Sequence, residues 1–205
     1  MRKLLTRIAF ALLFVAGAAA SDAAQKPPTP PSPTSAQATA AQNSPTQSAP
    51  PEQTQATATM QTFTSNDGRF SVLLPGSPTQ KALSFPLPSG AASNIYEFWV
   101  VLDNDNVTYI VMYNDYPPNY ANDGAQNVLA RTRDGAAKGK TLTSDVAIDL
   151  NGVPGRAFTV TGKDGSLYSV HQFLNGKRLY QLIVVYNKDH PATLTDQFMN
   201  SFRIF

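Results

Sequence analysis

The nine residues Arg178–Tyr186, RLYQLIVVY, decide the fold of this chain. In an extended segment successive side chains point to opposite faces, and here both faces are apolar: Tyr180, Leu182, Val184 and Tyr186 on one, Leu179, Ile183 and Val185 on the other. A strand of this kind lies inside a sheet and is covered on both sides. We therefore expect a layered domain with Arg178–Tyr186 in its middle.

Three turn signals before this strand divide the second half of the chain into an antiparallel meander. They are Asn151-Gly152, Asp164-Gly165 and Asn175-Gly176, and such pairs are favoured in tight hairpin turns. The turns separate runs with the composition and spacing of strands: Leu142–Leu150, Arg156–Gly162, Ser166–Leu174 and Arg178–Tyr186. In the first run the alternation predicts that one face is shared by Leu142, Ser144, Val146, Ile148 and Leu150.

The first half of the domain adds more strands, and two segments have helical spacing. The expected strands are Arg69–Leu74, Ile95–Leu102 and Val107–Tyr113, the last two joined by a turn at Asp103–Asn106. The expected helices are Gly124–Lys138 and Pro191–Ser201. We therefore expect an α+β fold, an antiparallel sheet of about six to seven strands covered by helices.

The N-terminal region has the pattern of a secretory signal peptide followed by a spacer. Arg2, Lys3 and Arg7 precede a short apolar run, Ile8–Ala20, and small residues follow. We expect residues 1–24 to be a signal peptide. Residues 25–61 are almost entirely Pro, Ala, Thr, Ser and Gln, too polar to form a core, so we expect a disordered linker. The α+β domain then spans residues 62–205.

The charge balance and the absence of cysteine narrow the range of functions that this chain could have. Of the 16 Lys and Arg and 14 Asp and Glu, three basic residues and one acidic residue lie in 1–24, which leaves 13 of each after cleavage. A neutral chain has no general attraction to nucleic acid or anionic lipid. The chain has no cysteine, so its stability depends on its core rather than on disulfides. We expect export to the periplasm, the cell surface or the medium, with no membrane span after cleavage.

Five segments resemble the PsbP-like domain family, which includes many exported bacterial proteins. They are Gly68–Gly76, Tyr113–Pro117, Asn151–Arg156, Lys177–Leu182 and Phe198–Arg203. The resemblance covers nearly all of residues 63–205. It implies an antiparallel sheet between helices, a PsbP-like α/β/α sandwich, and a family whose characterised members mostly bind or help to assemble other proteins.

No pattern in the sequence predicts a catalytic, cofactor-binding or metal site. Asp134–Thr141 is similar to a phosphate-binding loop, but Asp134 stands where that motif requires glycine. His171 and His190 are the only histidines, and neither belongs to a metal-binding or nucleophile motif. We therefore expect a protein that is not an enzyme and has no cofactor and no metal.

The candidate contact residues are Tyr116 and Tyr120, in a stiff Tyr- and Pro-rich loop, together with Trp99. Large amphipathic rings are enriched in interfaces, although the same rings also pack in cores. The leading hypothesis is an exported, non-enzymatic domain that binds or assembles another exported or envelope protein. In that role, alanine at Tyr116 and Tyr120 should leave the melting temperature nearly unchanged and abolish partner capture.

Two alternatives remain open at the level of sequence. One is a small-molecule or lipid carrier with an apolar cavity between sheet and helix, on the scale of several hundred Å³. The other is a hydrolase with dispersed residues, in which His171 would meet an acid and a serine in one cleft.

Overall fold

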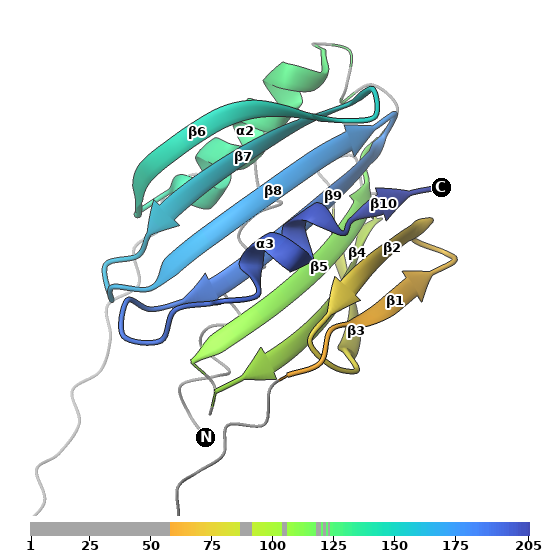
Figure 1. Cartoon of the computed structure of the whole chain (residues 1–205). Coiled ribbons are helices and arrows are strands. Elements are labelled where there is room, and N and C mark those ends of the chain that lie inside the picture. Colours follow the sequence, from red (N-terminus) through yellow and green to blue (C-terminus); the bar gives the residue numbers. More distant parts are fainter. Residues whose placement is uncertain (1–57, 87–91, 104–105, 118–119, 121, 123) are drawn as a thin grey trace, which may run out of the picture. The chain divides into compact units, whose positions relative to one another are not determined.

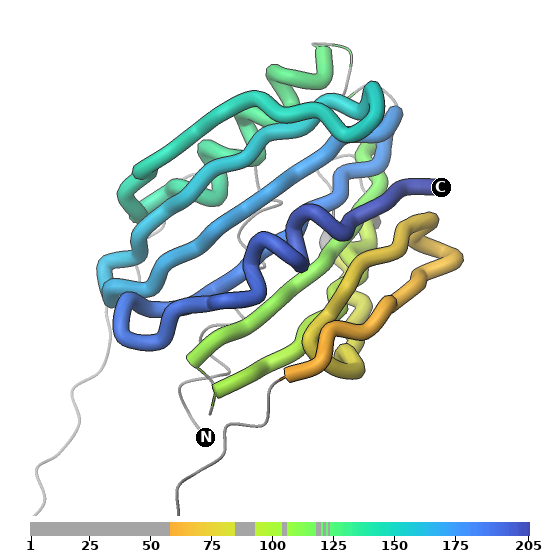
Figure 2. The backbone as a smooth tube through the Cα atoms, viewed as in Figure 1, coloured from red at the N-terminus to blue at the C-terminus, as the bar shows by residue number. Residues whose placement is uncertain are grey.

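The computed structural model describes residues 58–86, 92–103, 106–117, 120, 122 and 124–205. The expected signal peptide and most of the expected linker lie outside these residues. Figures 1 and 2 show a large twisted sheet with a helix behind it and a smaller sheet and a short helix in front. Among the described residues, neither helix is long and apolar enough to span a bilayer.

The large sheet has seven strands in the order β3-β4-β5-β9-β8-β7-β6, and every neighbouring pair is antiparallel. The central strand of the seven is β9, Arg178–Tyr186, as its two apolar faces predict. The other strands are β3 (Thr79–Pro86), β4 (Ala92–Leu102), β5 (Val107–Asp115), β6 (Thr141–Leu150), β7 (Val153–Thr161) and β8 (Leu167–Asn175). The antiparallel sheet and the meander from β6 to β9 agree with the sequence analysis.

One face of this sheet, here called the Tyr180 face, is covered mainly by a second sheet. That sheet has the order β1-β2-β10, formed by Gln61–Ser65, Phe70–Leu74 and Arg203–Ile204. Phe70, Val72 and Leu74 alternate along β2 and pack into the same core as Tyr180 and Leu182. The short helix α3 (Thr195–Asn200) completes this cover with Phe198 and Met199.

The opposite face, here called the Ile183 face, carries helix α2, Ala125–Ala137. The helix packs against β7 and β8, and its buried side chains are Val128, Leu129, Thr132 and Ala136. Gln172 on β8 fixes the helix to the sheet, because its Nε2 donates to the Leu129 carbonyl at 2.6 Å. The helix predicted for Gly124–Lys138 is confirmed.

The expected cover of helices is found only in part. One full helix covers part of the Ile183 face, whereas the Tyr180 face has a three-stranded sheet and a six-residue helix in place of the longer Pro191–Ser201. Local spacing identified Arg69–Leu74 as a strand but could not show that it leaves the large sheet to form a second layer. Strand β3 was not predicted, because TQKALSFP lacks a regular apolar alternation.

The edge strand β6 departs from the regular alternation that the sequence analysis predicted for Leu142–Leu150. The register shifts between Leu142 and Ser144, so Leu142 pairs with Val160 while Ser144 pairs with Thr159. Val160 and Thr159 are adjacent and point to opposite faces. The bulge therefore places Leu142 on the face opposite to Ser144 and Val146, which corrects the predicted common face.

Four of the polar side chains buried on the Ile183 face are not fully hydrogen-bonded within the described residues. They are Glu97, Asn114, Gln172 and Gln181, and each has a side-chain nitrogen or oxygen without a hydrogen-bond partner among the described residues. Glu97 lies opposite Met112, Met112 opposite Gln181, and Gln181 opposite Gln172. Three of the four polar groups thus share one row across β4, β5, β9 and β8, whereas Asn114 lies opposite Leu179. Buried groups without partners cost stability, so this row opposes folding.

Glu97→Gln should stabilise the protein at neutral pH by about 1 kcal/mol, the scale of one buried polar group. Burial raises the pKa of Glu97, and the Lys81 charge opposes this rise. The unfolded carboxyl thus ionises at a lower pH than the folded one, and stability falls as pH rises from the unfolded pKa through the raised pKa. Urea unfolding at pH 4 and pH 8 should show a larger gain at pH 8. An equal gain at both values would contradict a raised pKa.

Candidate functional site

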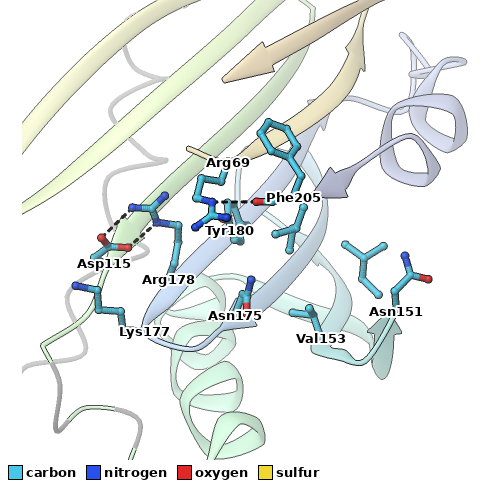
Figure 3. Close-up of a pocket in the computed structure, with 11 residues that line it drawn as sticks. Arg69, Asp115, Asn151, Val153, Asn175, Lys177, Arg178, Tyr180 and Phe205 are labelled. Atoms are coloured by element: carbon cyan, nitrogen blue, oxygen red, sulfur yellow. Dashed lines mark hydrogen bonds and ion pairs between the residues drawn. The ribbon is translucent and has the colours of Figure 1, made fainter. Parts of the chain in front are cut away.

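A cavity of about 470 Å³ lies at one end of the large sheet, and we call it the end pocket (Figure 3). Its walls come from strands and turns that are far apart in the sequence. The lining residues are Arg69, Asp115, Leu150, Asn151, Val153, Asn175, Lys177, Arg178, Tyr180, Ile204 and Phe205. The volume falls in the range of ligand pockets.

The meander brings several of these residues to the same end of the sheet. In consecutive antiparallel strands alternate turns share an end, so the β6–β7 turn with Asn151 lies at the same end as the β8–β9 turn with Asn175. Strand β5 ends there too, because Asp115 pairs with Arg178 at the start of β9. Two hairpin turns and one strand end thus form most of the pocket wall.

Arg178 organises this end of the sheet and has its charge compensated. Its Nε donates to Asp115 Oδ1 at 2.6 Å, and its Nη2 donates to Asp115 Oδ2 at 3.0 Å. Its Nη1 donates to the Asp67 carbonyl at 2.7 Å, and its guanidinium lies 4.9 Å from the centre of the Tyr113 ring. The bidentate bond lowers the pKa of Asp115 and raises the pKa of Arg178. This pair is therefore a structural clamp.

A second set of contacts fixes the β1–β2 turn above the clamp. The Tyr180 hydroxyl donates to the Gly68 carbonyl at 2.8 Å. At Gly68 a Cβ atom would lie 2.6 Å from the Phe70 ring, so this position requires glycine. The next residue, Arg69, has a positive φ of 55°, and its Nε donates to the Phe205 carbonyl at 3.0 Å. The turn thereby holds the Arg69 guanidinium at the pocket.

The end pocket retains polar groups that the described protein does not satisfy. The Arg69 Nη atoms, the Lys177 Nζ and the side-chain amides of Asn151 and Asn175 make no hydrogen bond or ion pair to other described residues. Three cationic side chains and one side-chain carboxylate give the side chains of the lining a formal charge of +2. Leu150, Val153 and Ile204 add an apolar wall. The arrangement suits an anionic group next to an apolar one.

Four of the five segments with a family resemblance meet at this pocket. Gly68–Gly76 supplies Arg69, Tyr113–Pro117 supplies Asp115, Asn151–Arg156 supplies two residues, and Lys177–Leu182 supplies three. The sequence analysis interpreted each segment as a turn or packing motif and missed the site. The signal that could have found it is the shared end of the turns in an antiparallel meander.

The predicted contact residues lie elsewhere. Tyr116 is only 7% exposed and packs with Val128 and Leu129 of α2. Its ring stacks on Tyr120 with centroids 4.2 Å apart, and its hydroxyl lies 3.3 Å from Thr132 Oγ1. Burial raises the pKa of Tyr116 to about 12. To contact a partner, this ring would have to leave its packed position.

Tyr120 and Trp99 are both half-buried, and they pack in two different hydrophobic clusters. Tyr120 packs against the cluster beneath α2, and the Arg131 guanidinium lies 5.3 Å from its ring centre. Trp99 packs against the separate cluster on the Ile183 face that contains Ile110 and Ile183. Neither residue lines the end pocket, so their role as contact residues stays a prediction.

A smaller cleft of about 210 Å³ lies on the Tyr180 face between β6–β8 and α3. It brings His171 together with Ser169 and Asp196, the combination that the hydrolase alternative needs. Ser169 and His171, however, are two residues apart on one strand, about 7 Å between Cα atoms, and no hydrogen bond joins the three side chains among the described residues. Burial lowers the pKa of His171, and the Asp196 charge opposes this shift. The groups share a cleft without forming a proton relay.

Metal binding has no support in the described part of the chain, where no three His, Asp or Glu side chains form a group that could hold an ion. The oxygen-rich turn at Asp103–Asn106 contains residues 104–105, which lie outside the described residues. At this turn His190 Nδ1 pairs with Asp103 Oδ2.

Comparisons with known proteins found similar solved structures. The chain is similar to the solution structure of cyanobacterial PsbP (CyanoP) from Synechocystis sp. PCC 6803, with 15% identity, a TM-score of 0.48, and coverage of 72% of this chain and 94% of that one. It is also similar to PA94 of Pseudomonas aeruginosa, a protein of unknown function and putative regulator, with 9% identity, a TM-score of 0.34 and coverage of 63% and 84%.

A third similar structure comes from Bacteroides thetaiotaomicron VPI-5482, with 12% identity, a TM-score of 0.35 and coverage of 70% of this chain and 48% of that one. No family model and no curated protein matches the chain. The first of these solved structures is named as a PsbP protein, and the five sequence segments resemble the PsbP-like family.

Proposed function

We propose that this protein is an exported, non-enzymatic binding domain that is held on the 25–61 linker and captures another exported or envelope protein at its end pocket. The observation that carries the proposal is the pocket itself. Its volume is about 470 Å³, and the exposed side-chain donors of Arg69 (Nη), Lys177, Asn151 and Asn175 have no partner among the described residues. Surface polar groups of this kind are available to a partner without breaking any contact inside the protein.

The rigidity of the pocket supports binding. Arg178 ties Asp115 on β5 to the Asp67 carbonyl of the β1–β2 turn, and Tyr180 ties β9 to the same turn. A pocket whose walls are already joined loses little conformational entropy when a partner binds. The proline-rich spacer and the signal pattern support a domain displayed outside the cytoplasm.

The carrier alternative has less support. It requires an apolar cavity between sheet and helix, whereas the end pocket is polar, lies among turns and is formally positive. The lipid version of this function therefore does not suit the pocket, although a small anion would. The hydrolase alternative rests on the His171 cleft, where no nucleophile is hydrogen-bonded to a base among the described side chains.

A photo-crosslinking amino acid at Asn151 should yield a discrete adduct with an exported protein in the producing cell. Asn151 is exposed and lines the pocket, so its substitution removes no core side chain. Because Asn151 has a positive φ of 52°, thermal unfolding of the variant is measured first to show that the turn still forms. The matched control is Lys163, an exposed residue of the β7–β8 turn, which lies at the opposite end of the sheet. The measurement is the adduct pattern on a denaturing gel, followed by mass spectrometry of the adduct.

The control position should give no adduct, or adducts that differ from those at Asn151. The same adducts at both positions, or none at Asn151, would contradict partner capture at the end pocket. Ester hydrolysis that disappears in Ser169→Ala would contradict a non-enzymatic function.

A further inference from the structure

We propose that the end pocket recognises a carboxylate of an acidic, partly apolar segment in its partner, and that Arg69 and Lys177 bind this carboxylate. The inference rests on the proposed function, because it names the chemistry that the partner presents. The three cationic side chains of the pocket differ in how many of their N–H donors are already hydrogen-bonded within the protein.

Arg178 has most of its donors in use within the protein. Its Nε and Nη2 are bonded to Asp115 and its Nη1 to the Asp67 carbonyl, so three of the five N–H donors of the guanidinium are used. An anion that took the Nε and Nη2 donors would have to break the clamp and leave the Asp115 carboxylate, which is only half-exposed, without its partner. Breaking such a pair costs more than a new surface contact returns. The ligand therefore meets the other two cations.

Arg69 and Lys177 have the opposite property. Arg69 uses only its Nε, which donates to the Phe205 carbonyl, and this bond orients the guanidinium while both Nη atoms stay available. The Lys177 ammonium makes no hydrogen bond or ion pair to another described residue, and its charge acts on Asp115 only through space. Figure 3 shows Arg69 and Lys177 on either side of the Arg178–Asp115 clamp, so a ligand that meets both cations lies across the clamp. A planar guanidinium with two free donors matches a carboxylate.

The remainder of the lining indicates what surrounds the anionic group. Asn151 and Asn175 offer neutral amides that can accept from or donate to a peptide backbone. Val153 and Ile204 form an apolar wall, as Figure 3 shows for Val153 opposite the charged residues. A lone inorganic anion would leave this wall unused. A peptide with a Glu or Asp next to a large apolar side chain would use both sides of the pocket.

The chain's charge balance favours a single anionic group over a polyanion. The chain without residues 1–24 has 13 basic and 13 acidic residues, so it lacks the general positive field that draws proteins to nucleic acid. The formal excess of two charges is local to the pocket. Local complementarity of this kind favours specificity for one contact.

The test is an NMR titration of the full chain labelled with ¹⁵N, with three probes: the blocked peptide Phe-Glu-Leu, its isostere Phe-Gln-Leu, and inorganic phosphate. We expect Phe-Glu-Leu to shift the Arg69 Nε–H and the Asn151 and Asn175 side-chain amides and to saturate. Phe-Gln-Leu should bind about tenfold more weakly, the scale of one charge-assisted hydrogen bond. Lys177→Gln should weaken Phe-Glu-Leu about tenfold.

The matched control is Lys188→Gln. Lys188 has a side chain that is 85% exposed, does not line the pocket and, within the described part of the chain, forms an ion pair only with the exposed Asp189. Phe-Glu-Leu should therefore bind this variant unchanged. Equal affinity for Phe-Glu-Leu and Phe-Gln-Leu, or an equal loss in Lys177→Gln and Lys188→Gln, would overturn the carboxylate proposal. Phosphate that binds the pocket more tightly than Phe-Glu-Leu would also overturn it, in favour of a free small anion.

The two proposals fail separately. A crosslinked partner at Asn151 together with no preference for Phe-Glu-Leu would overturn the carboxylate inference and leave the binding function. Selective binding of Phe-Glu-Leu without a crosslinked protein would support the pocket chemistry and contradict capture of a protein partner in the cell.

Discussion

Phe70→Ala should lower the free energy of unfolding by about 3–5 kcal/mol, the usual cost of deleting a buried aromatic ring. Phe70 lies on β2, is 0% exposed and is surrounded by five aromatic rings. The centroid distances are 6.0 Å to Phe63, 5.9 Å to Phe98, 6.2 Å to Tyr113, 6.1 Å to Tyr180 and 5.5 Å to Phe202. Chemical denaturation followed by tryptophan fluorescence measures the loss.

The reason for the size of this effect is the position of the ring between layers. Its neighbours come from both sheets, so the cavity left by alanine would separate the β1-β2-β10 sheet from the Tyr180 face. Val146→Ala is the matched control, because Val146 is 56% exposed on β6, and its loss should stay within about 0.5 kcal/mol. Comparable losses in the two variants would contradict this packing.

Tyr116→Ala should cost about 3 kcal/mol, because its buried ring fills the space beneath α2. This differs from the result expected for an exposed contact residue, and burial of the ring is the reason. Tyr116→Phe keeps the ring and removes only the bond to Thr132 Oγ1. Thr132 still donates to the Val128 carbonyl at 3.0 Å, so Tyr116→Phe should cost about 1 kcal/mol or less.

Thermal unfolding of both Tyr116 variants tests this placement. Tyr120→Ala serves as a comparison, because Tyr120 stacks on the same ring but is only half-buried, and it should cost less than Tyr116→Ala. If Tyr116→Ala left the melting temperature unchanged and abolished partner capture, the ring would be a contact residue and its packed position would be wrong.

These variants also separate the stability of the end pocket from its chemistry. Phe70 and Tyr180 pack against each other, and the Tyr180 hydroxyl donates to the Gly68 carbonyl in the turn that carries Arg69. Phe70→Ala should therefore disturb the pocket indirectly. Arg69 and Lys177 are exposed, and their replacement should change binding with little change in unfolding. A variant that alters both quantities therefore acts through the fold, whereas one that alters binding alone acts at the site.

The sequence was sufficient to predict the features that depend on short-range patterns. Sequence patterns indicated the approximate bounds of β4, β5, β8 and β9, because a strand buried on one face repeats its apolar residues with period two and a strand buried on both faces is a short continuous apolar run. The Asn151-Gly152 and Asn175-Gly176 turns were identified because tight hairpins need residues that tolerate positive φ, and Asn151, Gly152 and Gly176 all have it. The shorter α3 and the unpredicted β3 lacked such local signals.

The candidate site was decided by contacts between residues that are distant in the chain. Arg178 and Asp115 are 63 positions apart, and Tyr180 and Gly68 are 112 positions apart. No local period shows that these pairs meet, or that the Asp115 carboxylate neutralises Arg178 and leaves the donors of Arg69 and Lys177 available. The amino-acid sequence alone determined most of the strands of the large sheet, the hairpin turns between them and the central position of β9, because those follow from the neighbours of each residue. Only the tertiary structure decided which faces are covered and which charges are free, because both depend on packing between segments that the sequence separates.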